Sequence, residues 1–336
     1  GAALELRDQT LVQVQRQLDE LAAGLSRALS DRQVQGTAAS NGAATGFQID
    51  YTGWQPGNAI TLDYRDNTAG GAVKRILLVP TSGGAPATIP PEATSDPNAT
   101  IIRVDMTAGP AAIQAALAAR GINLTVDAPA ANTFRFVDDG LTNTTDVVAL
   151  SMGITVTGTT SGSPQLPFFV DSGYGNTAFT GSFEGVPHLT GLAQRLRINP
   201  TLQDQRAQAL VVFNASPATP QGDTTRPQFL VDALTSATRG FSSASGIGGR
   251  GAPFVSTVTD FTRRLVETHG ANAEAAQRLD EGQSVALSAI ESRFAEKAGV
   301  NVDQEMALLV QLQTAYGANA RMMTAIRDMM DMLMRI

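Results

Sequence analysis

The sequence contains no cysteine, and lysine is nearly absent. Without cysteine the chain cannot form a disulfide framework, a thiolate zinc site or a cysteine nucleophile. Only Lys74 and Lys297 are lysines among 24 basic residues, and the 336 residues carry a net charge of −7. The sequence therefore offers no basic patch dense enough to neutralise a phosphate backbone, which argues against nucleic-acid binding.

Long apolar runs are also missing. No run reaches the ~18 to 20 residues that a membrane span needs, so no membrane association is predicted. Residues 1–8 lack a basic region followed by an apolar core, so no Sec-type signal is predicted either. Because the sequence begins without methionine and directly in helix-patterned residues, we expect that a natural N-terminal portion precedes it.

The common catalytic and cofactor motifs do not occur. The sequence has no H-E-x-x-H, no G-x-S-x-G elbow and no P-loop. His188 and His269 have no second ligand at helical spacing, so both are predicted to be solvated residues. Residues 246–251 match G-x-G-x-x-G, but no hydrophobic strand precedes them, so we interpret them as a loop. From these motifs we predict no catalytic, cofactor-binding or metal-binding residues.

Aspartates and aromatics at residues 46–186 leave one chemical alternative open. The loop residues Asp127, Asp138, Asp139 and Asp146 match no EF-hand, and we interpret them as turn residues that bond their own backbone. In the alternative interpretation, Asp127, Asp138 and Asp139 would serve a carbohydrate-binding or carbohydrate-processing surface domain. Aromatics at strand positions usually belong to the core, yet three could form a sugar platform. These three are Tyr51, Trp54 and Tyr64.

Hydrophobic periodicity changes twice along the chain. From Leu4 to Ala28 apolar residues form one helical stripe, and Gly36 is predicted to end that helix. Residues 46–186 show short alternating runs typical of strands, one helix at 110–120, and a predicted hairpin turn at residues 139–140. Helical patterning returns after residue 187 and leads into a long predicted helix at 254–298.

These changes predict an α+β multidomain protein, a long coiled-coil-like helical rod with an inserted β-rich domain. Residues 1–45 and 187–301 would form the helical rod domain, and residues 46–186 the β-rich outer domain. Residues 302–336 would form a terminal coiled-coil helix. An insertion of this kind suits a fold whose two chain ends lie side by side.

The last 35 residues are the most informative. They contain one glycine, no proline and seven of the nine methionines. Apolar residues recur there every three or four positions, which predicts a coiled-coil seam with one polar interruption. A second apolar set covers much of the remaining circumference, so the helix is predicted to become ordered only inside an assembly. An ordinary core helix of a bundle would show the same pattern. The seam consists of Leu309, Leu312, Tyr316, Asn319, Met323, Ile326, Met330 and Leu333.

Several short segments resemble known sequences. Residues 299–305 (GVNVDQE), 311–316 (QLQTAY), 318–321 (ANAR) and the methionine-rich end resemble the C-terminal signature of bacterial flagellar axial proteins. Val302 and Gln304 stand where that signature usually has leucine and glutamate. Within these proteins, the segments at residues 2–8, 17–22 and 191–200 (GLAQRLRINP) resemble the hook-associated protein 1 family, which forms the hook-filament junction. Residues 46–186 do not carry the likeness and correspond to the family's variable outer domain.

The resemblance implies a structural subunit that is not an enzyme and has no cofactor. Such a subunit would leave the cytoplasm unfolded through the flagellar type III system and form a ring between hook and filament outside the cell. Its partners would be copies of itself, the hook protein, the next hook-associated protein, and an export chaperone that binds the C-terminal region. The alternatives are a flagellin-like or other axial subunit, and the carbohydrate-binding or carbohydrate-processing surface domain at 46–186.

Overall fold

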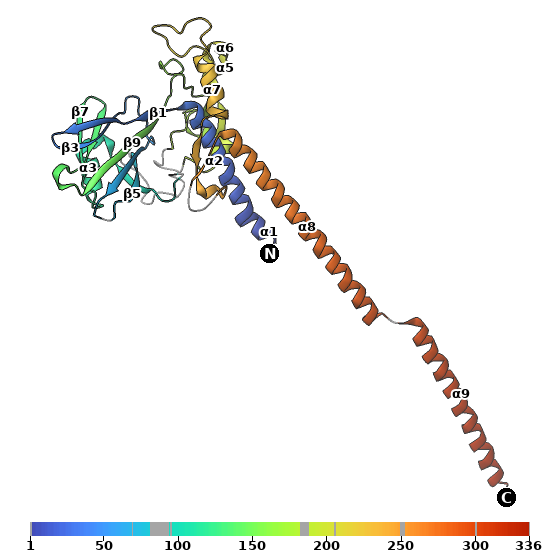
Figure 1. Ribbon diagram of the computed structural model, residues 1–336. Helices are drawn as coiled ribbons and strands as arrows, with labels where there is room; N and C mark the ends of the chain where they lie inside the picture. The colour runs from blue at the N-terminus through green and yellow to red at the C-terminus, as the bar shows by residue number, and fades with distance from the viewer. Residues whose placement is uncertain are drawn as a thin grey trace. The chain divides into compact units, whose positions relative to one another are not determined.

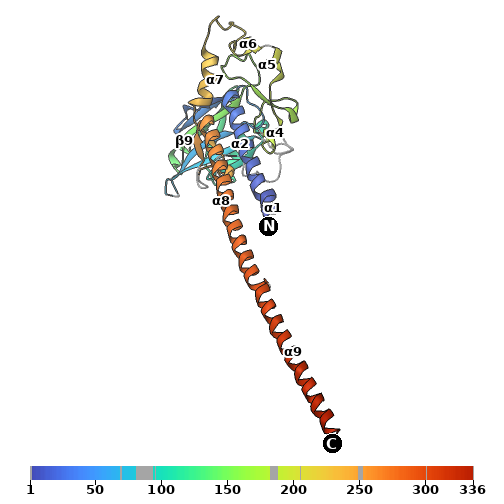
Figure 2. The same ribbon diagram turned by 90° about the vertical axis from the view of Figure 1, so that its right-hand side faces the viewer.

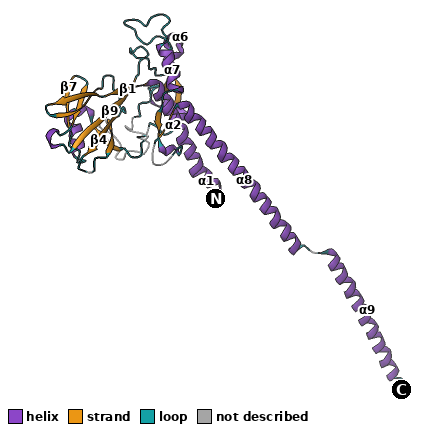
Figure 3. Ribbon diagram, viewed as in Figure 1, coloured by secondary structure: helices purple, strands orange, loops and turns teal. Residues whose placement is uncertain are grey.

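The computed structural model of the chain is an α+β fold (Figure 1). It describes residues 2–68, 70–80, 94, 96–181, 188–204, 206–248, 253–299 and 301–335. The chain divides into two compact units, residues 1–267 and 268–336, and each is treated by itself below. The first unit holds every described strand, whereas the described part of the second is almost entirely helical (Figure 3). Among the described helices, none is both long and apolar enough to cross a membrane.

Two sheets form the β-rich part of the first unit. The larger sheet has the order β1-β9-β4-β5-β6, and the smaller has the order β2-β3-β8-β7. Neighbouring strands are antiparallel except β5 and β6, which are parallel. The strands are β1 (Asp31–Gln35), β2 (Thr37–Asn41), β3 (Ala44–Asp50), β4 (Ile60–Asp66), β5 (Val73–Pro80), β6 (Thr100–Val104), β7 (Thr125–Ala130), β8 (Thr133–Val137) and β9 (Thr145–Thr155).

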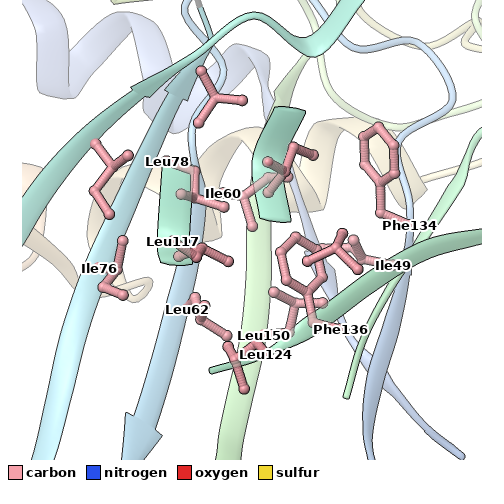
Figure 4. Close-up of a cluster of buried hydrophobic side chains, with 14 of the residues drawn as sticks. Ile49, Ile60, Leu62, Ile76, Leu78, Leu117, Leu124, Phe134, Phe136 and Leu150 are labelled. Carbon is pink, nitrogen blue, oxygen red and sulfur yellow. The ribbon is translucent and has the colours of Figure 1, made fainter. Parts of the chain in front are cut away.

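The alternation of side chains along these strands builds one hydrophobic core. In β4, Ile60, Leu62 and Tyr64 are buried and the residues between them are partly exposed. Residues of both sheets join in this core, as Figure 4 shows for part of the cluster. Helix α3 (Pro110–Ala118) adds Ile113 and Leu117 to it. The predicted helix at 110–120 is thus confirmed, with proline in its first turn.

The first long helix ends earlier than expected. Helix α1 (Ala2–Glu5), a π-helical turn (Leu6–Thr10) and α2 (Leu11–Ser30) follow one another, and β1 begins at the next residue. Gly36 therefore does not end the helix, and that prediction is wrong. Gly36 lies between β1 and β2, where the chain passes from the larger sheet to the smaller. A Cβ atom there would lie 2.9 Å from the Cβ of Leu150, so the crossing needs glycine.

The passage from α2 into β1 is a hydrogen-bonded joint. The Asp31 carboxylate accepts hydrogen bonds from the hydroxyl groups of Ser30 (3.1 Å) and Thr155 (2.9 Å). The side chain of Asn58 donates to the Thr155 hydroxyl (2.9 Å) and accepts from its backbone N–H (3.0 Å). Burial raises the pKa of Asp31. We call these four residues the α2–β1 joint.

The predicted hairpin at residues 139–140 is also wrong. The strands on either side, β8 and β9, belong to different sheets, and a 3₁₀ turn (Gly140–Thr142) connects them. The Asp138 carboxylate accepts hydrogen bonds from the backbone N–H groups of Thr45 (3.1 Å) and Gly140 (2.8 Å). Asp139 accepts one from the backbone N–H of Thr144 (3.0 Å). These bonds turn the chain away from β8 instead of back along it.

Short helices and two two-stranded sheets make up the rest of the first unit around α2. Gly24 of α2 faces the ring of Phe241, which stacks on Phe261 with centroids 4.0 Å apart. Phe254 lies in a strand, so the long helix begins at Val258 and not at Phe254 as predicted. The elements are β10 (Phe169–Asp171), α4 (Leu192–Arg195), β11 (Leu196–Ile198), α5 (Pro200–Asp204), α6 (Arg206–Ala209), α7 (Thr225–Thr235), β12 (Arg239–Phe241), β13 (Phe254–Ser256) and α8 (Val258–Ala298).

A buried arginine holds the loops beside α7. The Arg226 side chain is 0% exposed, and its hydrogen bonds among the described residues go to backbone carbonyl oxygens only. Burial lowers its pKa to about 10, so it stays charged at neutral pH. Five carbonyl groups from two separate segments thus converge on one guanidinium. The acceptors are Ser163 (3.1 Å), Pro164 (3.1 Å), Gln165 (3.1 Å), Ala209 (2.8 Å) and Val212 (2.6 Å).

Candidate functional site

Helix α9 (Val302–Leu333) carries the predicted seam and starts at a capped residue. The side-chain oxygen of Asn301 accepts hydrogen bonds from the backbone N–H groups of Asp303 (3.1 Å) and Gln304 (3.3 Å). This is the usual arrangement at a helix N-terminus, and the acidic residues of the first turn favour it further. Helical hydrogen bonding continues to Met334, whose N–H donates to the Met330 carbonyl (3.0 Å). The helix therefore has a defined start that the sequence encodes locally.

All eight seam residues lie on α9, and none of them is covered. Among the hydrophobic seam side chains, exposure ranges from 46% at Ile326 to 80% at Tyr316. No described residue of α9 is buried. Since the eight positions are spaced by three and four residues, they form one continuous stripe along the helix. Their role in contacts with other molecules remains a prediction.

The apolar surface of α9 is wider than this stripe. The line at residues 307, 314, 321, 328 and 335 reads Ala, Thr, Arg, Asp, Arg and forms the polar side of the helix. A second apolar set, on α9 and at Met334 just after it, is also exposed and lies on both sides of the seam. A coiled-coil partner would cover only the narrow seam, so one neighbouring helix could not bury the remainder. The second set is Met306, Val310, Ala320, Met322, Met329, Met332 and Met334.

Helix α8 adds exposed apolar side chains within the same unit. Leu279, Leu287, Ile290 and Phe294 are each more than half exposed. Exposed apolar surface of this extent is unfavourable at about 25 cal/mol per Å² and usually marks a contact surface. The described part of residues 268–336 therefore presents apolar surface on both of its helices.

The aspartates proposed for a carbohydrate site are engaged in the fold. Asp127 forms an ion pair with Arg135 (2.5 Å) and accepts a hydrogen bond from Asn41 (3.2 Å). Asp138 and Asp139 bond the backbone of the turn described above. Asp146 lies in β9, where its register partner is Arg65 of β4. The interpretation of Asp138 and Asp139 as turn residues is confirmed by these bonds.

The three aromatics of the possible sugar platform pack in and beside the β core. Tyr64 is buried, and the Tyr51 ring stacks on Phe134 with centroids 4.4 Å apart. Trp54 packs against the core and donates its indole N–H to the Asn58 carbonyl (3.0 Å). Aromatic rings held in this way do not present a common open face. The prediction that they are core residues is thus confirmed for Tyr64.

Of the two histidines, His188 lies in the first unit and His269 in the second. His188 is buried beside Tyr174 (centroids 4.1 Å apart) and Phe179, so its prediction as a solvated residue is wrong. Burial lowers its pKa and favours the neutral ring. His269 lies on α8. Within the described ranges, no three His, Asp or Glu side chains cluster as metal ligands. Of the G-x-G-x-x-G match, residues 249–251 lie outside the described residues.

The segment 191–200 is fixed to α2 by a side chain far away in the sequence. The Asp19 carboxylate accepts hydrogen bonds from the backbone N–H groups of Gly191 (2.7 Å) and Ala193 (2.9 Å), at the start of α4. Figure 2 shows α4 beside α2. Arg195 then pairs with the buried Asp171 of β10 (3.0 Å). The sequence showed this segment as a motif but gave no signal that Asp19 and Asp171 hold it.

Replacing Asp19 with alanine should loosen this segment. The variant leaves the N–H groups of Gly191 and Ala193 without their acceptor, so we expect the free energy of unfolding to fall by ~1–3 kcal/mol. Urea denaturation followed by circular dichroism would measure the change. Asp8→Ala is the control because Asp8 forms only an exposed ion pair with Arg7, and it should change stability by less than ~1 kcal/mol. Equal effects of the two substitutions would refute the capping role.

A comparison with known protein families points to the same part of the chain as the exposed apolar surface of α9. Residues 291–336 match the family described as flagellar basal body rod FlgEFG protein C-terminal. The matched part comprises the end of α8 and all of α9. No curated protein matches the chain. The match supports a structural subunit of the flagellar axial structure, a class of protein that is not enzymatic. Such subunits associate with copies of themselves and with other axial proteins.

Proposed function

We propose that the protein is a structural subunit that joins the flagellar hook to the filament and assembles through α9. The exposed apolar surface of α9 carries this proposal, because the family match falls on the same residues. The segments at 2–8, 17–22 and 191–200 support the junction in particular, since they resemble the hook-associated protein 1 family. The last of these is held on α2 by Asp19, so it belongs to an ordered part of the subunit.

Assembly would bury α9 among helices of neighbouring copies. The seam from Leu309 to Leu333 would pack as a coiled coil, and the second apolar set would contact further helices. Burying a large apolar side chain is worth about 1.5–3 kcal/mol, so contacts along a helix of 32 residues can drive the association. Asn319, the polar residue in the seam, would fix the register of the helices. We propose a helical rod at 1–45 and 187–301 and an outer domain at 46–186; within 1–45 the helices end at Ser30, and β1 and β2 pair with strands of the outer domain.

The same surface explains the other proposed partners. Before assembly, an export chaperone would cover the apolar residues of α9 in the cytoplasm and prevent premature self-association. The chain would then pass through the flagellar type III system and contact the hook protein and the next hook-associated protein outside the cell. Neither nucleic acid nor a membrane is a proposed partner.

A rod or hook subunit is the second candidate, because the matching family takes its name from basal body rod proteins. Immunogold electron microscopy of intact flagella, with antibody against residues 46–186, separates the two. We expect gold in a band between hook and filament. Label along the hook, in the basal body, or along the whole filament would overturn the junction role and leave another axial subunit. Absence of label from flagella would contradict both candidates.

A further inference from the structure

Sulfur is distributed very unevenly in this chain. There is no cysteine, so the nine methionines hold all of the sulfur. Seven of them lie between Met306 and Met334, on α9 and the residue that follows it. The other two are Met106 and Met152, both in the β-rich part of the first unit. Any reagent that attacks thioether sulfur therefore has most of its targets on one helix.

The two groups of methionines also differ in exposure. The seven methionines of α9 and its end are 56% to 86% exposed. Met152 is 1% exposed inside the β core, and Met106 is partly buried against the same core. Oxidation of a thioether follows its exposure to the oxidant. The buried sulfur atoms should thus react slowly, and those of α9 should react first.

We propose that α9 is a site of reversible methionine oxidation, and that peroxide oxidants control its assembly through this site. In the reaction the thioether sulfur attacks one oxygen of hydrogen peroxide and gives up two electrons. The O–O bond breaks, an S–O bond forms, and the other oxygen leaves as water. The product is methionine sulfoxide, which methionine sulfoxide reductases return to methionine.

Oxidation changes the surface that the proposed function uses, and this part of the inference rests on that function. Met323 and Met330 lie in the seam, and Met322 and Met329 lie next to it. A sulfoxide is polar and needs hydrogen bonds, so burying it between helices is unfavourable. It also turns a flexible apolar side chain into a chiral polar one that packs poorly. Once α9 is buried in an assembly, its sulfur atoms are protected.

The first measurement is a map of oxidation in the whole, unassembled chain. The protein is treated with limiting hydrogen peroxide, digested and analysed by mass spectrometry, in which each sulfoxide adds one oxygen atom. We expect oxidised peptides from residues 302–335 while the Met152 peptide stays unmodified. Oxidation of Met152 at the same rate as the α9 methionines would overturn the inference, whatever the protein does in the cell.

The second measurement is self-association by sedimentation velocity before and after oxidation. We expect oxidation to weaken it about tenfold or more, and reductase treatment to restore it. The fourfold variant Met322→Leu, Met323→Leu, Met329→Leu and Met330→Leu should resist this effect, because leucine has a similar volume and no sulfur. The matched control, Met306→Leu with Met334→Leu, should remain sensitive.

The outcomes separate this inference from the proposed function. Association that survives full oxidation of α9 would overturn the control of assembly, even if the map is as expected. If the untreated chain does not associate at any concentration, assembly through α9 fails as a function and the proposed control of assembly fails with it. The oxidation map would still test, independently of assembly, whether the methionines of α9 are oxidised before Met152.

Discussion

Aspartate at both Tyr316 and Ile326 is expected to abolish incorporation of the protein into flagella. Both side chains lie in the seam of α9 and are exposed in the single chain. The substitutions should therefore cost the isolated subunit little. In the assembly they would bury two unpaired charges, each at a cost of several kcal/mol, so we expect incorporation to fall by more than a hundredfold. Flagella from cells that make only the variant would be purified and probed for the protein.

The control for this experiment is the opposite side of the same helix. Ala307→Asp with Thr314→Asp adds the same charge on the polar line of α9, where Arg321 and Asp328 already lie. We expect normal incorporation of this control variant. Normal incorporation and motility of the Tyr316 and Ile326 variant would refute assembly through the seam. If neither variant is incorporated into flagella, any added negative charge on α9 prevents incorporation. The seam would then have no special role in assembly.

Removing the side chain of Arg226 is expected to cause the largest loss of stability. In Arg226→Ala five backbone carbonyl groups lose their donor, and the space of a fully buried side chain is left behind. Each unsatisfied buried acceptor costs ~1–3 kcal/mol, although local opening will admit water to some of them. We expect the free energy of unfolding to fall by about 4 kcal/mol or more, measured by urea denaturation followed by circular dichroism.

Two comparisons sharpen this test. Arg226→Lys keeps the charge but has only three donors, so it should be intermediate between wild type and alanine. Arg263→Ala removes an arginine whose side chain is 70% exposed and paired with Asp260, and it should cost less than ~1 kcal/mol. Hydrogen exchange should become faster near residues 163–165 and 209–212 in Arg226→Ala. A loss under 1 kcal/mol for Arg226→Ala would show that water replaces the guanidinium without penalty.

Sequence patterns predicted the helices and strands whose formation depends mainly on residues close together in the chain. The alternating runs in residues 46–186 predicted strands such as β4, and the helix predicted at 110–120 is α3. Residues 36–46 consist of small and polar residues without alternation, so β2 and the start of β3 were not predicted. Of these strands, β3 pairs with the distant β8, and β2 pairs with β3 across a tight turn; β1 before them pairs with the distant β9. Such partners leave no mark on a short window of sequence.

The candidate site also contains features that a sequence pattern predicts and contacts that it does not predict. The eight seam residues were assigned from periodicity, and the structure places all of them on one continuous helix. The Asp19 carboxylate was not noticed, because the residue that it bonds is 172 positions away. His188 was predicted to be solvated because no second ligand stands at helical spacing from it. The sequence around a lone histidine does not show whether the fold buries it. A sequence pattern reveals a surface along one element, whereas a contact between elements needs the fold.

The α2–β1 joint has a mechanical consequence. Ser30 ends the helix and Asp31 begins the strand, so no flexible tether separates α2 from the larger sheet. The hydrogen bonds among Ser30, Asp31, Asn58 and Thr155 resist rotation about this point. A sideways load on the sheet is therefore carried into α2 as a bending moment instead of being absorbed by a hinge. In a fibre exposed to viscous drag, such a joint would hold the orientation of the larger sheet relative to α2.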